Sequence, residues 1–213
     1  MAKEQLRILY PGGSSWNAGK NGFDGPGPAG LVVFAGGESV MFDCGIEFAG
    51  SGANRNRAPN LDIIQQKLSA LVLTHSHYDH MAASSALASR ELLTDTCKVY
   101  GTPQTLRMLP LGMDEMARHG FGDWFSISDI LERRTVIKEP GVIELTPDIS
   151  MYVGPAGHIP GALYAAVKFK KTGCVGLMSG DMGFHEQLVV GASRFPDDLP
   201  DEVINELLQR AKR

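Results

Sequence analysis

Short apolar runs separated by glycine-rich turns dominate the first sixty residues. Apolar alternation and β-branched residues predict strands at 6–10, 31–35 and 40–43. The polar segment 51–60, which contains glycine and proline, predicts a loop, and the amphipathic segment 61–68 predicts a short helix. The pattern therefore indicates hairpins of an open sheet, followed by a helical connection.

The middle of the chain mixes strand and helix patterns. The apolar run 71–73 predicts a buried strand, and the segment 81–93, rich in alanine and leucine, predicts a helix. Residues 99–100 predict another short strand. A helix is expected from 103 to about 108, opened by a proline and continued over 111–117.

The second half of the chain is rich in strand patterns. Strands are predicted at 134–137, 142–145, 150–153, 165–169 and 175–178. Neither an internal repeat nor a linker long enough to separate two domains is present. We therefore expect one layered α/β domain over residues 1–213.

Composition narrows the range of functions. The chain has 43% hydrophobic residues, enough for a sizeable core, and its net charge of −4 gives no global basic field for nucleic-acid binding. The cysteines are few, odd in number and widely spaced, at Cys44, Cys97 and Cys174. Neither a signal-peptide pattern nor an apolar stretch of about 18 residues is present, so we expect a cytoplasmic protein that does not enter a membrane.

Half of the six histidines lie in the segment THSHYDH, from Thr74 to His80, directly after an apolar run. Imidazole and carboxylate ligands suit a borderline cation such as zinc. Every second side chain of an extended segment points to the same side, so His75 and His77 would face the same way. Asp79 and His80 can then turn toward a second cation. A histidine-rich polar loop without metal is the alternative, and this density of histidine argues against it.

Two later segments each place one possible ligand at a strand end. His158 lies in the turn Gly157–Gly161, and Asp181 follows an apolar strand that ends at Met178. Alone, either residue would be assigned a structural role. Together with the histidine cluster, they indicate a metal site built from distant parts of the chain.

These motifs resemble those of the metallo-β-lactamase superfamily over nearly the whole chain. The match comprises the pattern HxHxDH at 75–80, the later His158 and Asp181, and the segment MFDCGIEF around Asp43. With YGTPQTL, GHIPGALY and SGDM, the chain is most similar to the β-CASP branch, which includes ribonuclease J-type and cleavage-and-polyadenylation-type nucleases. The resemblance implies an αββα sandwich.

The resemblance also implies two zinc sites that share one carboxylate. The first would be held by His75, His77 and His158, and the second by Asp79, His80 and the bridging Asp181. Asp79 and Asp181 would be catalytic, orienting a hydroxide held between the two ions. Asp43 would lie behind the ligands and orient a histidine without touching metal.

The chain departs from the family pattern after Asp181. The superfamily supplies one more histidine to the second metal from a later strand, whereas here only His185 follows, four residues on. We expect His185 and His119 to be surface residues, which leaves the second site one ligand short. Residues 182–213 contain a predicted amphipathic helix at 201–213 and leave no room for the cap domain and final strands of a β-CASP protein. The chain is thus interpreted as the N-terminal part of a longer nuclease, a truncated homologue, or a protein whose site is completed by a partner or a second copy.

Other candidate residues have simpler interpretations. Cys44 is expected to pack in a buried strand, and Lys168, Lys170 and Lys171 to form a solvated face. The glycine-rich segment 11–15 lacks both common phosphate-binding patterns, so we interpret it as a turn whose backbone amides overlook the metal site.

Three functions follow as hypotheses. The leading one is a zinc-dependent phosphodiesterase that cleaves RNA. The second is a hydrolase of another ester, thioester or lactam bond, because the same metal chemistry attacks carbonyl groups. The third is a non-catalytic or partner-dependent homologue, which the missing histidine favours.

Overall fold

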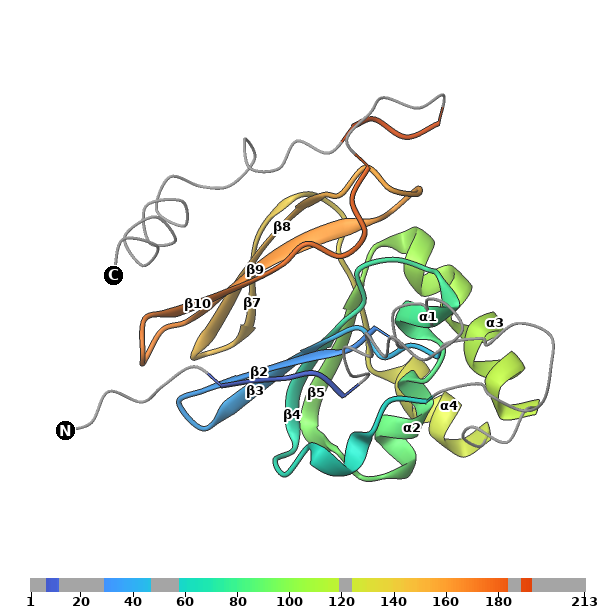
Figure 1. Ribbon diagram of the computed structural model, residues 1–213, viewed down its shortest axis with the longest axis horizontal. Helices are drawn as coiled ribbons and strands as arrows, with labels where there is room; N and C mark the ends of the chain where they lie inside the picture. The colour runs from blue at the N-terminus through green and yellow to red at the C-terminus, as the bar shows by residue number, and fades with distance from the viewer. Residues whose placement is uncertain (1–6, 12–28, 47–57, 119–123, 184–188, 193–213) are drawn as a thin grey trace, which may run out of the picture.

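Two β-sheets stack against each other, and a layer of helices covers one of them (Figure 1). The computed structural model describes residues 7–11, 29–46, 58–118, 124–183 and 189–192. The six-stranded sheet runs in the order β1 (Arg7–Leu9), β2 (Leu31–Ala35), β3 (Glu38–Phe42), β4 (Leu68–Val72), β5 (Leu93–Gly101) and β6 (Arg134–Val136). The four-stranded sheet runs in the order β10 (Cys174–Met178), β9 (Leu163–Phe169), β8 (Ile149–Pro155) and β7 (Gly141–Thr146). The helical elements are η1 (Leu61–Ile63), α1 (Tyr78–Met81), α2 (Ser84–Ser89), α3 (Pro103–Arg118) and α4 (Trp124–Glu132).

Strand direction brings several strand ends to one edge of the molecule. β1, β2 and β3 pair antiparallel, whereas β3, β4, β5 and β6 pair in parallel. The second sheet is antiparallel throughout. Ligand sites of open α/β sheets lie outside the carboxyl ends of parallel strands, so the edge where β3, β4 and β5 end is the place to look for one.

The central strands β2, β3 and β4 of the first sheet are buried on both faces, which explains their apolar runs. In β2, Val32 and Phe34 belong to the core under the helices, while Val33 and Ala35 belong to the core between the sheets. This period of two separates the two cores along a single strand. The strand patterns read from the sequence are confirmed, since each of the ten predicted strands has a counterpart.

The predicted helix 61–68 is wrong. Only a 3₁₀ turn forms at η1, where the Asn60 side chain accepts a hydrogen bond from the backbone N–H of Asp62, and Leu68 already belongs to β4. Leu61, Ile64 and Leu68 are buried at a spacing that suits a helix. Pairing of Leu68 with Leu93 of β5 fixes an extended chain instead.

The predicted helix 81–93 is replaced by two shorter ones. α1 begins three residues earlier, at Tyr78, and α2 ends at Ser89. Glu91 has a φ of 54°, a left-handed conformation that ends the helix and lets Leu93 open β5. The two helical segments predicted around Pro110 form the single helix α3, whereas α4 was not predicted.

Three of the four layers of the predicted sandwich are formed by described residues: helices, first sheet and second sheet. The predicted helix at 201–213 lies outside them. Among the helices that the structure describes, none has the length and apolar character needed to cross a membrane.

Candidate metal centre

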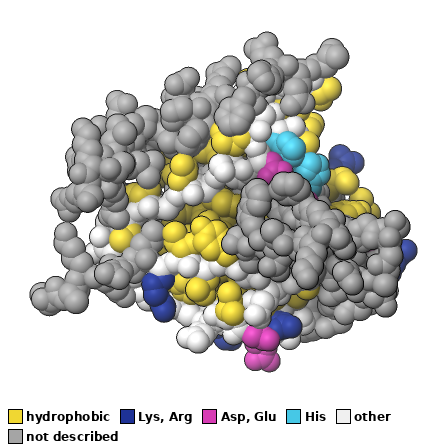
Figure 2. Space-filling view, viewed as in Figure 1, with side chains coloured by type: hydrophobic (Ala, Val, Ile, Leu, Met, Phe, Trp, Pro, Cys, Tyr) yellow, Lys and Arg dark blue, Asp and Glu magenta, His cyan; other side chains and the backbone are white. Residues whose placement is uncertain are grey.

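The strand ends gather the predicted chemistry at one edge. Asp43 follows β3, the segment 74–80 follows β4, His158 lies between β8 and β9, and Asp181 follows β10. Figure 2 shows histidine and acidic side chains meeting at the surface of one face. Side chains from both sheets therefore converge at a solvent-accessible spot.

A close backbone contact holds the start of α1 against the end of β3. The backbone N–H of Cys44 donates to the carbonyl of His80, and that of Ile46 donates to the carbonyl of Tyr78. Between them, Gly45 packs directly on the Asp79 backbone, where a Cβ would overlap the carbonyl group. Glycine is required at this position because no side chain fits between the two segments.

Four side chains point their donor atoms at one another. Nδ1 of His77 lies 3.0 Å from Nε2 of His75 and 3.3 Å from Nε2 of His158. Oδ2 of Asp181 lies 3.5 Å from Nε2 of His158 and 3.9 Å from Nε2 of His75. One donor atom from each of the four residues lies within 4.8 Å of every other.

This donor set fits a tetrahedral cation. Ligand atoms about 2.0–2.1 Å from a zinc ion are about 3.3 Å apart in a tetrahedron, close to most of the separations here. Three imidazole nitrogens and one carboxylate oxygen also match the ligand chemistry of zinc. His75, His77, His158 and Asp181 could thus hold one ion.

A second, looser set of donors adjoins the first. Nε2 of His80 lies 3.5 Å from Oδ1 of Asp181 and 3.9 Å from Oδ2 of Asp79. The two oxygens of Asp181 therefore face different histidines, as a bridging carboxylate would. Asp79 and His80 are brought close to the first group but do not belong to it.

Asp43 is fully buried behind these side chains. Its Oδ1 accepts a hydrogen bond from the backbone N–H of Thr74 at 2.7 Å, and its Oδ2 lies 2.8 Å from Nδ1 of His80. The residue has a φ of 58°, uncommon outside glycine and tolerated best by Asp and Asn. Such strain in a buried acidic residue is typical of a functional site.

Thr74 links Asp43 to a second histidine, a connection that sequence reasoning missed. Its hydroxyl lies 2.8 Å from Oδ2 of Asp43 and 3.0 Å from Nδ1 of His75, and Thr74 and His75 are both fully buried. One carboxylate thus orients His80 directly and His75 through the hydroxyl. A hydroxyl residue directly before the histidine motif was the available signal.

The surroundings shift the pKa values of two histidines in opposite directions. Burial, followed by the neighbouring His80, His77 and His158, lowers the pKa of His75 to about 2, so its ring is neutral. Burial also opposes the charged form of His80. The hydrogen bond to Asp43 and the charges of nearby carboxylates nevertheless raise its pKa above the ordinary value.

The loop that carries His158 is fastened at two points. The Thr102 hydroxyl donates to the carbonyl of Gly161 at 2.8 Å, and the backbone N–H of Leu163 donates to the carbonyl of Thr74 at 2.9 Å. Gly161 has a φ of 82°, and a Cβ there would crowd Gln104. The second sheet is thereby tied to the first beside the metal centre.

The remaining sequence candidates do not belong to either group of donors or lie outside the described residues. Cys44 is fully buried, as predicted, and burial followed by the Asp43 charge raises the pKa of its thiol. Lys170 pairs with Glu144 of β7, and Lys171 pairs with Asp148 in the turn between β7 and β8. His119, His185 and residues 12–15 of the glycine-rich segment lie outside the described residues.

Comparison with known proteins agrees with this arrangement. A family model described as the beta-lactamase superfamily domain matches residues 38–188. Ribonuclease TTHA0252 from Thermus thermophilus is 29% identical over 177 residues, covering 82% of this chain and 39% of that protein. Cleavage and polyadenylation specificity factor subunit 3-II from Arabidopsis thaliana is 24% identical over 194 residues, covering 83% of this chain and 30% of that protein.

Among solved structures, the metallo-β-lactamase fold protein YhfI from Bacillus subtilis is similar, with a TM-score of 0.46 and 13% identity, covering 81% of this chain and 60% of that one. The chain spans well under half the length of the two curated relatives. The family match covers most of the chain and includes Asp43, the histidine cluster, His158 and Asp181. The chain belongs to the metallo-β-lactamase superfamily and is similar to its β-CASP branch.

Proposed function

We propose that this chain carries the catalytic site of a zinc-dependent phosphodiesterase that cleaves RNA. The observation that carries the proposal is the convergence of three histidines and Asp181 on one point, with His80 on the other side of the same carboxylate. The names of the two curated relatives, a ribonuclease and a cleavage and polyadenylation factor subunit, support RNA as the substrate. Membership of the superfamily supports hydrolysis in general.

Six side chains would hold the two ions. His75, His77 and His158 would hold one zinc ion, Asp79 and His80 the other, and Asp181 both. Bound zinc lowers the pKa of coordinated water and offsets negative charge on a phosphoryl oxygen. Asp79 and Asp181 are about half exposed, with side chains 52% and 48% accessible, so their free oxygens can orient an incoming water and accept its proton.

The buried residues would keep the ligand nitrogens available. Asp43 accepts the Nδ1 proton of His80, which leaves the Nε2 lone pair facing Asp181. The Thr74 hydroxyl accepts the Nδ1 proton of His75 and donates its own to Asp43, which leaves Nε2 of His75 facing His77. Fixing the tautomer in this way is the usual role of groups behind metal ligands.

The direct test measures metal content per chain by elemental mass spectrometry, followed by hydrolysis of labelled single-stranded RNA on the same sample. Bound zinc together with cleavage would support the proposal. We expect His77→Ala to lose the first metal and all hydrolysis, because His77 contacts both other histidines of the first group.

The control is His185→Ala, for which we expect little change. Equal loss in both variants would show that His185 is a ligand of the second site. One metal or none in the unmodified chain, with no cleavage, would contradict the proposal and favour a partner-dependent protein.

A further inference from the structure

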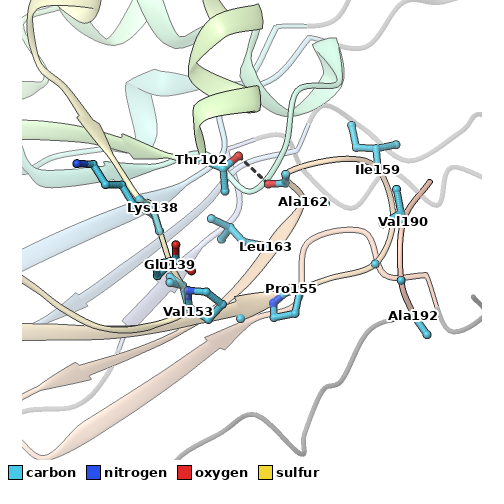
Figure 3. Close-up of a pocket in the computed structure, with 16 residues that line it drawn as sticks. Thr102, Lys138, Glu139, Val153, Pro155, Ile159, Ala162, Leu163, Val190 and Ala192 are labelled. Carbon is cyan, nitrogen blue, oxygen red and sulfur yellow. Dashed lines mark hydrogen bonds between the residues drawn. The ribbon is translucent and has the colours of Figure 1, made fainter.

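A pocket of about 370 Å³ is lined in part by the loop that carries His158 (Figure 3). Its walls come from the end of β8, the connection between β8 and β9, the connection between β6 and β7, and residues 190–192. Small-molecule sites in proteins usually measure about 300–1,000 Å³. The pocket is therefore sized for one ring-containing group rather than for a length of polymer.

The walls are mostly apolar, with a carboxylate at one side. Figure 3 shows Ile159 and Val190 on one side of the pocket and Glu139 and Val153 on the other, with Leu163 between them. Lys138 extends away from Ile159 and Val190. A group bound here would have apolar faces and a polar edge.

The pocket and the metal centre share one loop. Gly157 and Ile159, the two neighbours of His158, both line the pocket. The hydrogen bond from Thr102 to Gly161 fixes that loop, and both residues also belong to the pocket wall. A substrate held in the pocket would thus sit directly against the segment that presents His158.

We propose that this pocket binds one nucleobase of an RNA strand whose phosphate lies at the metal centre. The inference rests on the proposed function. A nucleobase has flat apolar faces, which suit the aliphatic walls, and a polar edge, where an exocyclic amino group can donate to Glu139. An acyl chain would pack against the apolar walls but would offer no hydrogen-bond donor to the Glu139 carboxylate.

The first experiment follows binding without relying on cleavage. Metal-loaded protein is titrated with a single-stranded phosphorothioate RNA hexamer, and the methyl signals of Ile159 and Val190 are recorded by NMR. We expect these signals to shift, and the shift to be lost with hexamers that lack bases. The exposed Val142, outside the pocket, serves as the reference signal and should not move.

A second experiment fills the pocket. Gly191 lines the pocket and a Cβ there would meet no atom within 4 Å, so Gly191→Leu adds an apolar side chain to the pocket wall without a clash at the Cβ. We expect RNA affinity to fall about tenfold, which corresponds to about 1.4 kcal/mol. The control is Val189→Leu, at a neighbouring side chain that is 82% exposed and does not line the pocket; it should bind like the unmodified protein.

The outcomes separate this inference from the proposed function. RNA cleavage that Gly191→Leu leaves unchanged, or methyl shifts that persist without bases, would overturn the pocket assignment alone. Base-dependent shifts without cleavage would support the pocket and count against the ribonuclease. If Gly191→Leu impaired hydrolysis of a short-chain ester but not RNA binding, the pocket would be an acyl site and the inference would be wrong.

Discussion

At the scale of single residues, Thr74 and Asp43 orient two of the histidines, although neither residue belongs to the candidate ligands. Asp43 has no contact with solvent and reaches His75 only through the Thr74 hydroxyl. A buried carboxylate is costly unless its oxygens are hydrogen-bonded, and Thr74 supplies two of the three bonds to this one. The threonine therefore stabilises the carboxylate and orients a histidine at once.

Thr74→Val keeps the shape of the side chain but removes the hydroxyl. We expect zinc affinity at the first site to fall about 10- to 100-fold, the range typical of groups that orient metal ligands. Chelator competition measures the change directly. Thr74→Ser, which retains the hydroxyl, should restore most of the affinity, and a serine variant as weak as the valine variant would count against this role.

The histidine cluster could be predicted at this scale because its ligands lie within six residues at a strand end. Thr74 could not be assigned a role, because its function depends on Asp43, which comes from another strand. His158 and Asp181 were identified as possible ligands because each follows a predicted strand, and only their division between two metal sites was implied by family resemblance. The pocket beside them was not predicted, since its wall combines separate segments that only the fold brings together.

At the scale of elements, the short helix α1 is positioned by backbone contacts rather than by its own length. A helix of four residues is not stable alone. Hydrogen bonds from residues 44 and 46 to the helix, together with the close approach of Gly45, hold it at the end of β3. Asp79 and His80 owe their places to this contact.

Gly45→Ala should therefore destabilise the protein by about 1–3 kcal/mol or more, because the methyl group would force the two backbones apart. Urea unfolding of the metal-free protein measures the loss. Gly191→Ala is the matched control, since its methyl group would meet open space. Similar stabilities for both variants would show that the chain relaxes easily around residue 45.

Helix prediction failed where pairing between distant strands overrode local preference. The spacing of Leu61, Ile64 and Leu68 suited a helix, yet Leu68 pairs in β4. In contrast, the central strands β2, β3 and β4 could be recognised because burial on both faces leaves a largely apolar run. Local pattern thus predicted the strands well and the helical connections poorly.

At the scale of the whole molecule, the candidate metal centre spans the two sheets. His75 and His77 follow a strand of the first sheet, whereas His158 and Asp181 belong to connections of the second. The apolar core between the sheets lies beneath them. An ion bound here would connect the two halves of the sandwich.

The proposed zinc ion should accordingly stabilise the folded chain. At a free concentration 100 times its dissociation constant, binding adds about 2.7 kcal/mol to the free energy of unfolding. Thermal unfolding with and without zinc measures this gain. His158→Ala should lose most of it, because the variant keeps His75 and His77 but lacks the histidine from the second sheet. If the full gain persisted, the ion would be held by the first sheet alone.

The division of the candidate ligands between two sheets also determines when the metal can bind during folding. No local segment contains the complete donor set, so a nascent or refolding chain has no early fragment that could hold the ion in this geometry. Tight metal uptake must then follow the docking of one sheet on the other. Tight binding of the ion would therefore report the final step of folding, because it requires that the two sheets have already packed together.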